Sequence, residues 1–233
     1  MENIQESKQL ISDSKNIYLV TSQEPEAIAS TLALFYTLKE LGKNVNLVLD
    51  SLPENLKFLS PSLDFISYPK NFVISIPTSV AQVSQISYEK NSDALKINLT
   101  LENGNIKKDN IAFYFQEAKP DLIITIGIKN YQKELSEKLN SFGFLLDSPV
   151  LNIDNEQNNQ KFGKINLIGP LSITELIIGV TEHIDKNSAN CLLAGLVAYT
   201  NNFKNNLSAE IFRIASDLMK AGADLKTITE NIR

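Results

Sequence analysis

The stretch IYLVTSQEPEAIASTLALFYTLKELGKNVNLVL, residues 17–49, decides the fold. Residues 17–21 form a short apolar run of β-prone side chains and are predicted to be a buried strand. A helix should follow, because Pro25 suits its first position and Gly42 suits its C-terminal end. Residues 45–49 are a second apolar run, so the stretch predicts a β-α-β unit. The helix carries an apolar stripe for packing on a sheet: Ile28, Leu32, Phe35 and Leu38.

The same pattern resumes after Pro120. Residues 122–126 and 150–153 indicate two more buried strands, and residues 131–142 indicate a helix between them. Near-continuous apolar strands that alternate with helices predict an α/β fold, with a parallel sheet covered on both faces. Further helices are predicted at residues 3–13, 173–184, 188–199, 208–221 and 225–232.

Residues 71–115 break this pattern. They contain short strand-like runs separated by the turn signals Asn91-Ser92-Asp93 and Asn103-Gly104, which predict an antiparallel β-ribbon inserted into the α/β domain. Residues 95–101 alternate between apolar and polar side chains, so one face of the ribbon should be apolar. Either the parent domain or a partner subunit could pack on that face, and the sequence leaves both alternatives open.

Composition excludes several classes of protein. The 233 residues carry a net charge of −5 with scattered lysines and arginines, which argues against non-specific binding to nucleic acid. The first residues resemble no signal peptide and no apolar run reaches membrane-spanning length, so a cytoplasmic protein without membrane contact is expected. Cys191 is the only cysteine, and its apolar surroundings favour a small buried side chain over a reactive thiol.

Polar segments follow three of the predicted strands. They are residues 21–26, 127–129 and 154–156, and ligands of an open parallel sheet bind beyond such carboxyl ends. The chain resembles the DHH phosphoesterases in a series of motif segments that occur in the same order as in the family. These segments are residues 18–35, Gly42-Lys43, Leu52–Leu59, and residues 149–154, 162–167, 194–203 and 221–224. This family includes nanoRNases, phosphoadenosine-phosphate phosphatases, exopolyphosphatases and single-strand exonucleases. The resemblance implies the α/β sandwich of that family, with a β-rich insertion and a helical C-terminal part.

The departures from the family concentrate where its members hold a pair of manganese ions. The resemblance places Ser22 at the position of the first-motif histidine and Glu26 at that of the first aspartate, while the Gly-Asp that follows in the family has no counterpart. Gly127 replaces the aspartate that bridges the metals. The remaining family-site positions are Asp154, which keeps the family's residue, and Asn155, Glu156 and Tyr199, which do not.

This pattern predicts a degenerate metal site with no catalytic residue and no expected cofactor. The weak metal candidates are Asp154, Glu156 and Glu26, which would give an all-oxygen site for manganese or magnesium. Ordinary structural roles stay open beside this: Glu26, like Glu24, suits the first turn of a helix, which Ser22 or Glu24 would cap, and Asp154 suits a strand end that accepts backbone hydrogen bonds.

Other polar residues have structural interpretations. His183, the only histidine, matches no family ligand and is interpreted as a residue near a helix C-terminus. Ser172 and Glu175 have the spacing of a capping box, and Asp224 is placed to cap the last helix. The family's second, substrate-binding domain is expected to be absent, which leaves open whether residues 1–233 are a natural single domain or a fragment.

The leading hypothesis is a catalytically degenerate DHH phosphoesterase-like protein that acts through binding or self-assembly. The expected partner is a second copy or another protein, held through the β-ribbon. One alternative is a residual manganese-dependent phosphoesterase that acts on short oligonucleotides or nucleoside phosphates. Another is a nucleotide-sensing domain without catalysis. The most useful single observation is whether the crevice beside Asp154 is open and metal-occupied or filled by side chains, with Tyr199 as the first candidate for filling it.

Overall fold

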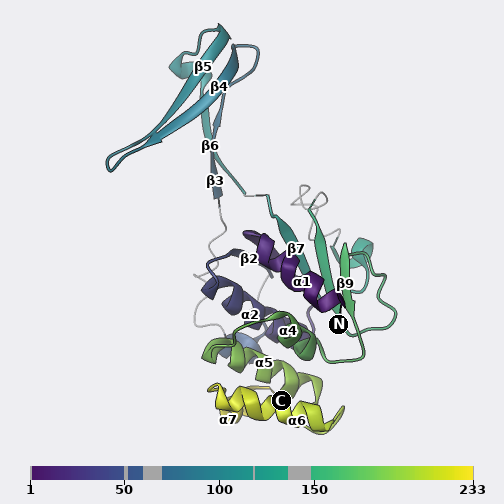
Figure 1. Ribbon diagram of the computed structural model, residues 1–233. Coiled ribbons are helices and arrows are strands. Elements are labelled where there is room, and N and C mark those ends of the chain that lie inside the picture. Colours follow the sequence, from purple (N-terminus) through teal and green to yellow (C-terminus); the bar gives the residue numbers. More distant parts are fainter. Residues whose placement is uncertain (1, 50–51, 60–69, 118, 136–147, 233) are drawn as a thin grey trace. The chain divides into compact units, whose positions relative to one another are not determined.

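A computed structural model describes residues 2–49, 52–59, 70–117, 119–135 and 148–232 (Figure 1). The chain divides into two compact units. The main unit comprises Met1–Pro69 and Lys119–Arg233, and the ribbon unit comprises Lys70–Ala118. We describe each unit by itself.

A five-stranded parallel sheet forms the centre of the main unit, in the order β2-β1-β7-β8-β9. Its strands are buried because their apolar residues meet packed layers on both faces, as predicted. The chain passes from β1 to β2 on one side and later returns to β7 on the other side of β1, so the strand order reverses between β1 and β7. The strands are β1 (Asn16–Thr21), β2 (Asn44–Val48), β7 (Leu122–Ile126), β8 (Val150–Asp154) and β9 (Ile165–Ile168).

Six α-helices are described in the main unit, and the larger core lies between the sheet and this helical layer (Figure 1). Helix α2 packs on β1 and β2 and on α5, and α6 and α7 pack on the far side of α5. The helices are α1 (Glu2–Asp13), α2 (Pro25–Glu40), α4 (Ile173–Val180), α5 (Lys186–Tyr199), α6 (Ala209–Lys220) and α7 (Leu225–Asn231), with a 3-10 helix η1 (Glu54–Leu59) and a π-helical turn η4 (Tyr131–Leu135).

Local sequence signals fix most helix ends. Pro25 begins α2, and Gly42 follows it with a φ of +73°, a conformation that glycine adopts without strain. Ser172 and Glu175 form the predicted capping box of α4, and Asp224 caps α7. Of the two caps predicted for α2, Glu24 occupies the N-cap position but its side chain accepts no capping hydrogen bond, and Ser22 Oγ accepts a hydrogen bond from Glu24 N at 3.4 Å.

Two boundaries in the helical region differ from the prediction. Helix α4 ends at Val180 instead of residue 184, because Thr181 adopts an extended conformation with φ −91° and ψ 143°. His183 therefore lies beyond the helix, where its Nε2 is 3.8 Å from Glu40 Oε2. Helix α5 begins at Lys186, two residues earlier than predicted, because the Asp185 side chain accepts a hydrogen bond from Ser188 N.

The ribbon unit consists of two antiparallel pairs, β3 with β6 and β4 with β5. Its elements are β3 (Lys70–Ser75), β4 (Ala81–Lys90), β5 (Leu95–Gly104), the short η3 (Lys108–Asn110) and β6 (Ala112–Glu117). Together with the parallel sheet and the C-terminal helices, these extra antiparallel strands confirm the predicted fold class.

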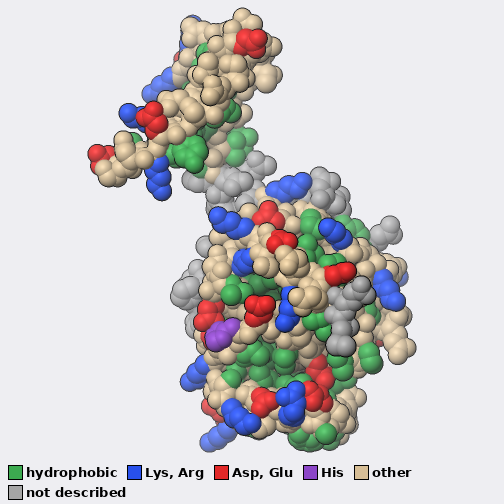
Figure 2. All heavy atoms as spheres, viewed as in Figure 1, with side chains coloured by type: hydrophobic (Ala, Val, Ile, Leu, Met, Phe, Trp, Pro, Cys, Tyr) green, Lys and Arg blue, Asp and Glu red, His purple; other side chains and the backbone are tan. Residues whose placement is uncertain are grey.

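One face of the β4–β5 pair is apolar and exposed. Cross-strand pairs on this face join Ile86 to Leu99 and Tyr88 to Ile97. Tyr88 is 75% exposed and Ile86 is 70% exposed, and Figure 2 shows hydrophobic side chains at the surface of this unit. Within the described residues of the ribbon unit, nothing covers this face, which is unusual for large apolar side chains.

Two further features concern Cys191 and the length of the helices. Cys191 is buried among apolar side chains of α5, and burial raises the pKa of its thiol, as expected for a structural residue. Among the described residues, no helix combines the length and apolarity needed to cross a membrane.

Candidate functional site

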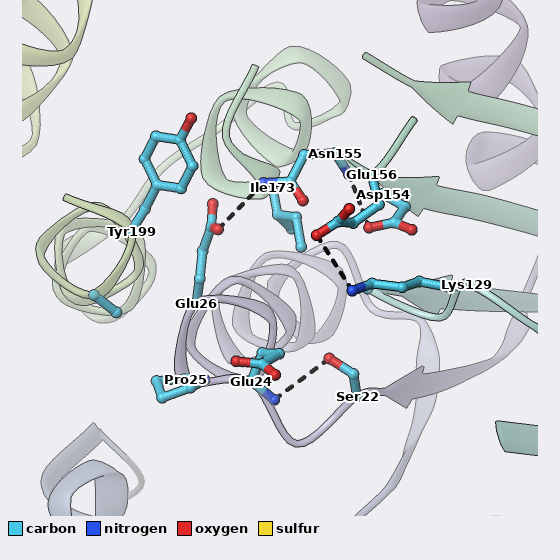
Figure 3. A pocket seen from close by; sticks show the side chains of 12 residues that line it. Ser22, Glu24, Pro25, Glu26, Lys129, Asp154, Asn155, Glu156, Ile173 and Tyr199 are labelled. Carbon is cyan, nitrogen blue, oxygen red and sulfur yellow. Dashed lines mark hydrogen bonds and ion pairs between the residues drawn. The ribbon is translucent and has the colours of Figure 1, made fainter. Parts of the chain in front are cut away.

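A pocket of about 370 Å³ lies at the carboxyl ends of β1, β7 and β8 (Figure 3). This is the edge of the sheet where the strand order reverses, the usual ligand position in open parallel sheets. The pocket brings together all seven family-site positions named from the sequence: Ser22, Glu26, Gly127, Asp154, Asn155, Glu156 and Tyr199. Glu24, Pro25, Lys129, Ile173 and Ala198 complete its lining.

Asp154, the last residue of β8, is almost fully buried and its carboxylate is already hydrogen-bonded. Asn155 N donates to Asp154 Oδ1 at 2.9 Å, and Asn159 Nδ2 donates to Asp154 Oδ2 at 2.7 Å. Burial raises the pKa of Asp154, and these two hydrogen bonds oppose the rise. The carboxylate is therefore held by the chain on both oxygens, in the structural role that the sequence left open.

Asn159 is a site residue that sequence reasoning missed. Its side chain is buried and joins the turn after β8 to the turn after β7, because Nδ2 also donates to Ile128 O at 2.8 Å. Its Oδ1 accepts hydrogen bonds from Asn152 Nδ2 and from Lys161 N, both at 2.8 Å. Asn152 in turn accepts from Thr125 Oγ1 at 3.0 Å. A buried network of neutral amides and a hydroxyl thus supports the one aspartate of the pocket.

Glu26 points from the first turn of α2 toward the N-terminus of α4 (Figure 3). Its Oε1 accepts a hydrogen bond from Thr174 N at 3.3 Å, and its Oε2 accepts one from Asn155 Nδ2 at 3.4 Å. Burial raises the pKa of Glu26 to about 7, although these donors lower it. Its carboxyl group is therefore close to half-ionised at neutral pH.

Lys129 and Glu156 form an ion pair at the rim, with Lys129 Nζ 3.2 Å from Glu156 Oε1. Both side chains are nearly half exposed, so solvent screens the pair. The hydrogen bond to Glu156 raises the pKa of Lys129. Lys129 is the only lysine or arginine that lines the pocket in the part of the chain that the structure describes, against four carboxyl groups.

Gly127 has too little space around it for a side chain. Its φ is +67°, and a Cβ atom built there would lie 2.7 Å from Ser22 Oγ and 2.9 Å from Ala27 Cβ. Ser22 can rotate, but Ala27 is buried in the first turn of α2 and has no rotamer that withdraws it. Atoms of Ser22 and Ala27 therefore occupy the space that an aspartate side chain would need at this position, which the resemblance assigns to a metal-bridging aspartate.

Tyr199, at the end of α5, lines the pocket without filling it. Burial, followed by the nearby Glu26, raises the pKa of its hydroxyl group. The crevice beside Asp154 is thus open, and Tyr199 does not fill it. Within the described ranges, no group of three or more His, Cys, Asp or Glu side chains is arranged to hold a metal ion.

Comparisons with known proteins agree on the fold. No protein-family model matches the chain. The chain is 23% identical over 226 residues to the "Bifunctional oligoribonuclease and PAP phosphatase NrnA" of Thermus thermophilus, a match that covers 93% of this chain and 53% of that protein. The crystal structure of an exopolyphosphatase-related protein from Bacteroides fragilis superposes with a TM-score of 0.67 at 18% identity, over 99% of this chain and 60% of that one.

The chain therefore has a DHH phosphoesterase-like fold. It spans about half the length of the curated relative that it matches. At these identities the similarity establishes the fold, and the activity of the pocket has to be argued from its own residues.

Proposed function

We propose that this chain is a DHH phosphoesterase-like domain without metal-dependent hydrolysis, which acts through binding and self-association. The observation that carries the proposal is the state of Asp154, whose two carboxylate oxygens accept hydrogen bonds from Asn155 N and Asn159 Nδ2. Each of these oxygens keeps a second lone pair, but among the described residues no group of three or more His, Cys, Asp or Glu side chains is arranged around Asp154 to complete a metal site.

The remaining pocket residues do not fit a pair of metal ions. Two-metal hydrolysis needs several convergent ligands on each ion and a separation of about 3.5–4 Å between the ions. Gly127 supplies no ligand and has no room for one, and Ser22 stands where the family's histidine would supply nitrogen. Glu26 is turned toward hydrogen-bond donors at the α4 N-terminus.

The self-association part of the proposal rests on the ribbon unit. Its apolar face is exposed on both strands of the β4–β5 pair, and the two ends of the unit are adjacent because Lys70 pairs with Glu117. The unit is thus an insertion that a short linker can replace. Exposed apolar sheet faces of this kind mark association surfaces.

Hydrolysis of a dinucleotide in the presence of manganese tests the first part. The proposal expects no product above the protein-free blank, for the chain itself and equally for its Asp154→Ala variant. Because Asp154→Ala removes a buried hydrogen-bonded group and can unfold the site, Glu156→Gln at the exposed rim serves as a second variant. Hydrolysis that both variants abolish would establish the residual phosphoesterase instead, an activity in keeping with the printed name of the Thermus relative.

Light scattering tests the second part. The intact chain is expected to associate, and a variant with residues 71–115 replaced by a short Gly-Ser linker is expected to be monomeric. A strictly monomeric intact chain would remove self-association. The open pocket also favours a second candidate, a domain that senses a nucleotide without catalysis, which calorimetry against mononucleotides and cyclic dinucleotides would reveal.

A further inference from the structure

Strand β5 has one unpaired edge. In the part of the chain that the structure describes, β5 pairs only with β4, so the N–H and C=O groups of its other edge have no strand partner. The strand is ten residues long, and each of its side chains is exposed or half-buried. A long edge of this kind is a template for pairing with another strand.

The sequence of β5, LKINLTLENG, is close to chemically symmetric about Leu99. If β5 pairs antiparallel with itself across a two-fold axis at Leu99, residues whose numbers add to 198 lie opposite each other. Ile97 then lies opposite Leu101 of the second copy, and Asn98 lies opposite Thr100. Apolar residues meet apolar residues on one face, and polar residues meet polar residues on the other.

Charge strengthens this match. Lys96 and Glu102 are both exposed, lie on the polar face, and stand equally far from Leu99 on either side. In the two-fold arrangement each Lys96 lies opposite a Glu102, so the dimer gains two cross-strand ion pairs and no like-charge contact. A lysine alone in an edge strand discourages pairing with another strand. An acidic residue equally far from Leu99 on the other side instead favours pairing with a second copy in one register.

The edge of β4 offers no such match. Its charged residues, Glu89 and Lys90, are adjacent and point to opposite faces, so no two-fold pairing that keeps one common apolar face places them opposite each other. A two-fold axis at Ile86 would instead place Glu89 opposite an uncharged residue, and the register of β4 is irregular between Gln82 and Gln85. The two edges of the same hairpin therefore differ, and only the β5 edge is complementary to itself.

We propose that β5 pairs antiparallel with β5 of a second copy of this chain, with Leu99 at the two-fold axis. The product is a four-stranded sheet in the order β4-β5-β5-β4, whose apolar side chains share one face. This inference deepens the proposed function, on whose self-association it rests, by naming the partner and the register. A two-stranded hairpin is marginal in water, and a four-stranded sheet with a joint apolar face is the more stable arrangement.

Charge reversal tests the register. Glu102→Lys brings two positive charges together in both symmetric contacts, because Lys96 of the second copy lies opposite, and it disturbs no charged pair inside the hairpin. The dimer dissociation constant, measured by sedimentation equilibrium at low salt, should rise at least about tenfold. The triple variant Glu89→Lys, Lys96→Glu and Glu102→Lys restores opposite charges both across the two-fold axis and at the pair of residues 89 and 96 inside the hairpin, and should return the constant close to its original value.

Glu89→Lys is the matched control. It changes a charge opposite Lys96 within the hairpin, on the far strand from the proposed contact, and should leave the dissociation constant nearly unchanged. If Glu89→Lys weakens the dimer as much as Glu102→Lys and the triple variant gives no recovery, hairpin stability explains the effect and the proposed register is wrong.

A disulfide gives a second, independent readout. Opposed Cα atoms in an antiparallel pair lie about 4.5–5.5 Å apart, within disulfide range, so Leu99→Cys should form a covalent dimer under mild oxidation. Leu95→Cys is the control, because it lies on the same face and is more exposed, but its two copies would be about 26 Å apart at eight residues' separation. The buried Cys191 is common to both variants.

The outcomes separate this inference from the proposed function. Cross-linking by Leu99→Cys alone, together with the charge rescue, supports the β5 pairing. Equal cross-linking by both cysteines in a chain that does associate overturns the pairing and leaves self-association standing. A monomeric chain at every concentration overturns both, whereas manganese-dependent hydrolysis would overturn only the non-catalytic part of the proposed function.

Discussion

The side chains of the ribbon unit and those of the pocket in the main unit have opposite environments. In the pocket, polar groups that could face a ligand are bound to one another: Asp154 is tied to Asn159, and Glu26 to Thr174 N. In the ribbon unit, large apolar groups such as Ile86 and Tyr88 are left in solvent. Side chains tied to their own chain contribute to folding, whereas exposed apolar ones lower their free energy when a partner covers them. The contrast predicts that substitutions at the pocket mainly change stability, and that the proposed association depends on the ribbon unit.

The largest expected effect of a single substitution is at Asn159. Asn159→Ala removes both donors to Asp154 and Ile128 O and leaves buried polar groups without partners, so the free energy of unfolding should fall by about 2–4 kcal/mol. Urea unfolding measures this change in the free energy of unfolding. Asn98→Ala, on the exposed polar face of β5, is the control and should cost less than about 0.5 kcal/mol. Equal effects would erase the contrast between the two regions.

Glu26 should make stability fall as the pH rises. Its pKa in the folded chain is about 7, against an ordinary value of 4.5, so between these values the folded state holds a proton that the unfolded state has released. Stability is then full below about pH 4.5 and declines up to about pH 7, by at most about 3 kcal/mol.

Glu26→Gln removes this dependence, so the variant should gain stability relative to the original chain as the pH rises from 4.5 to 7. Asp154, whose pKa burial also raises, is present in both proteins and cancels in the difference. Thermal unfolding of both proteins at a series of pH values measures this difference in stability. A difference that is flat with pH would show that the carboxyl group titrates normally.

Restoring the family's aspartate at position 127 should harm the fold without creating a metal site. Gly127→Asp places a Cβ against Ala27 at a positive φ, which should cost about 1–3 kcal/mol. Gly169→Asp is the matched control, since a Cβ there meets only Leu176 at an ordinary 3.9 Å. Thermal unfolding with and without manganese tests whether the variant binds the metal. A Gly127→Asp variant that manganese stabilises would mean that the pocket still accepts a metal.

The smallest effect belongs to the pocket rim. Glu156→Gln breaks the ion pair with Lys129, and because both partners are nearly half exposed the loss should be below about 1 kcal/mol and should vanish in high salt. Urea unfolding at two salt concentrations measures this. A larger loss that salt does not screen would assign the rim a structural role like that of Asn159.

The sequence predicted the elements with strong periodicity and missed those that tertiary contacts decide. Strands β1 and β7 and helix α2 carry long apolar patterns and fall close to their predicted bounds. Strand β9 was not predicted, because its four residues include the polar Asn166 and show too little alternation. The predicted helix at 131–142 is described only as the turn η4, and residues 136–147 lie outside the described residues.

The pocket residues were predictable where a motif or a strand end marked them, and Asn159 was not. It lies in the run Asn155-Glu156-Gln157-Asn158-Asn159, whose composition is typical of a solvated loop. Only the folded chain shows that Asn159 is buried and that its neighbour Asn158 is exposed. Likewise, alternation along residues 95–101 predicts the apolar face of the ribbon, but only the structure shows that β5 pairs with β4 alone among the described residues.

Binding of manganese to the intact chain tests the central claim most directly. Free manganese gives an electron paramagnetic resonance signal that weakens when the ion binds to protein, so the ion is titrated into the chain and into its Asp154→Asn variant. The account predicts the same free-ion signal in both titrations as in buffer. A signal lost in the intact chain and recovered in Asp154→Asn would show that Asp154 is a metal ligand, and would contradict the account.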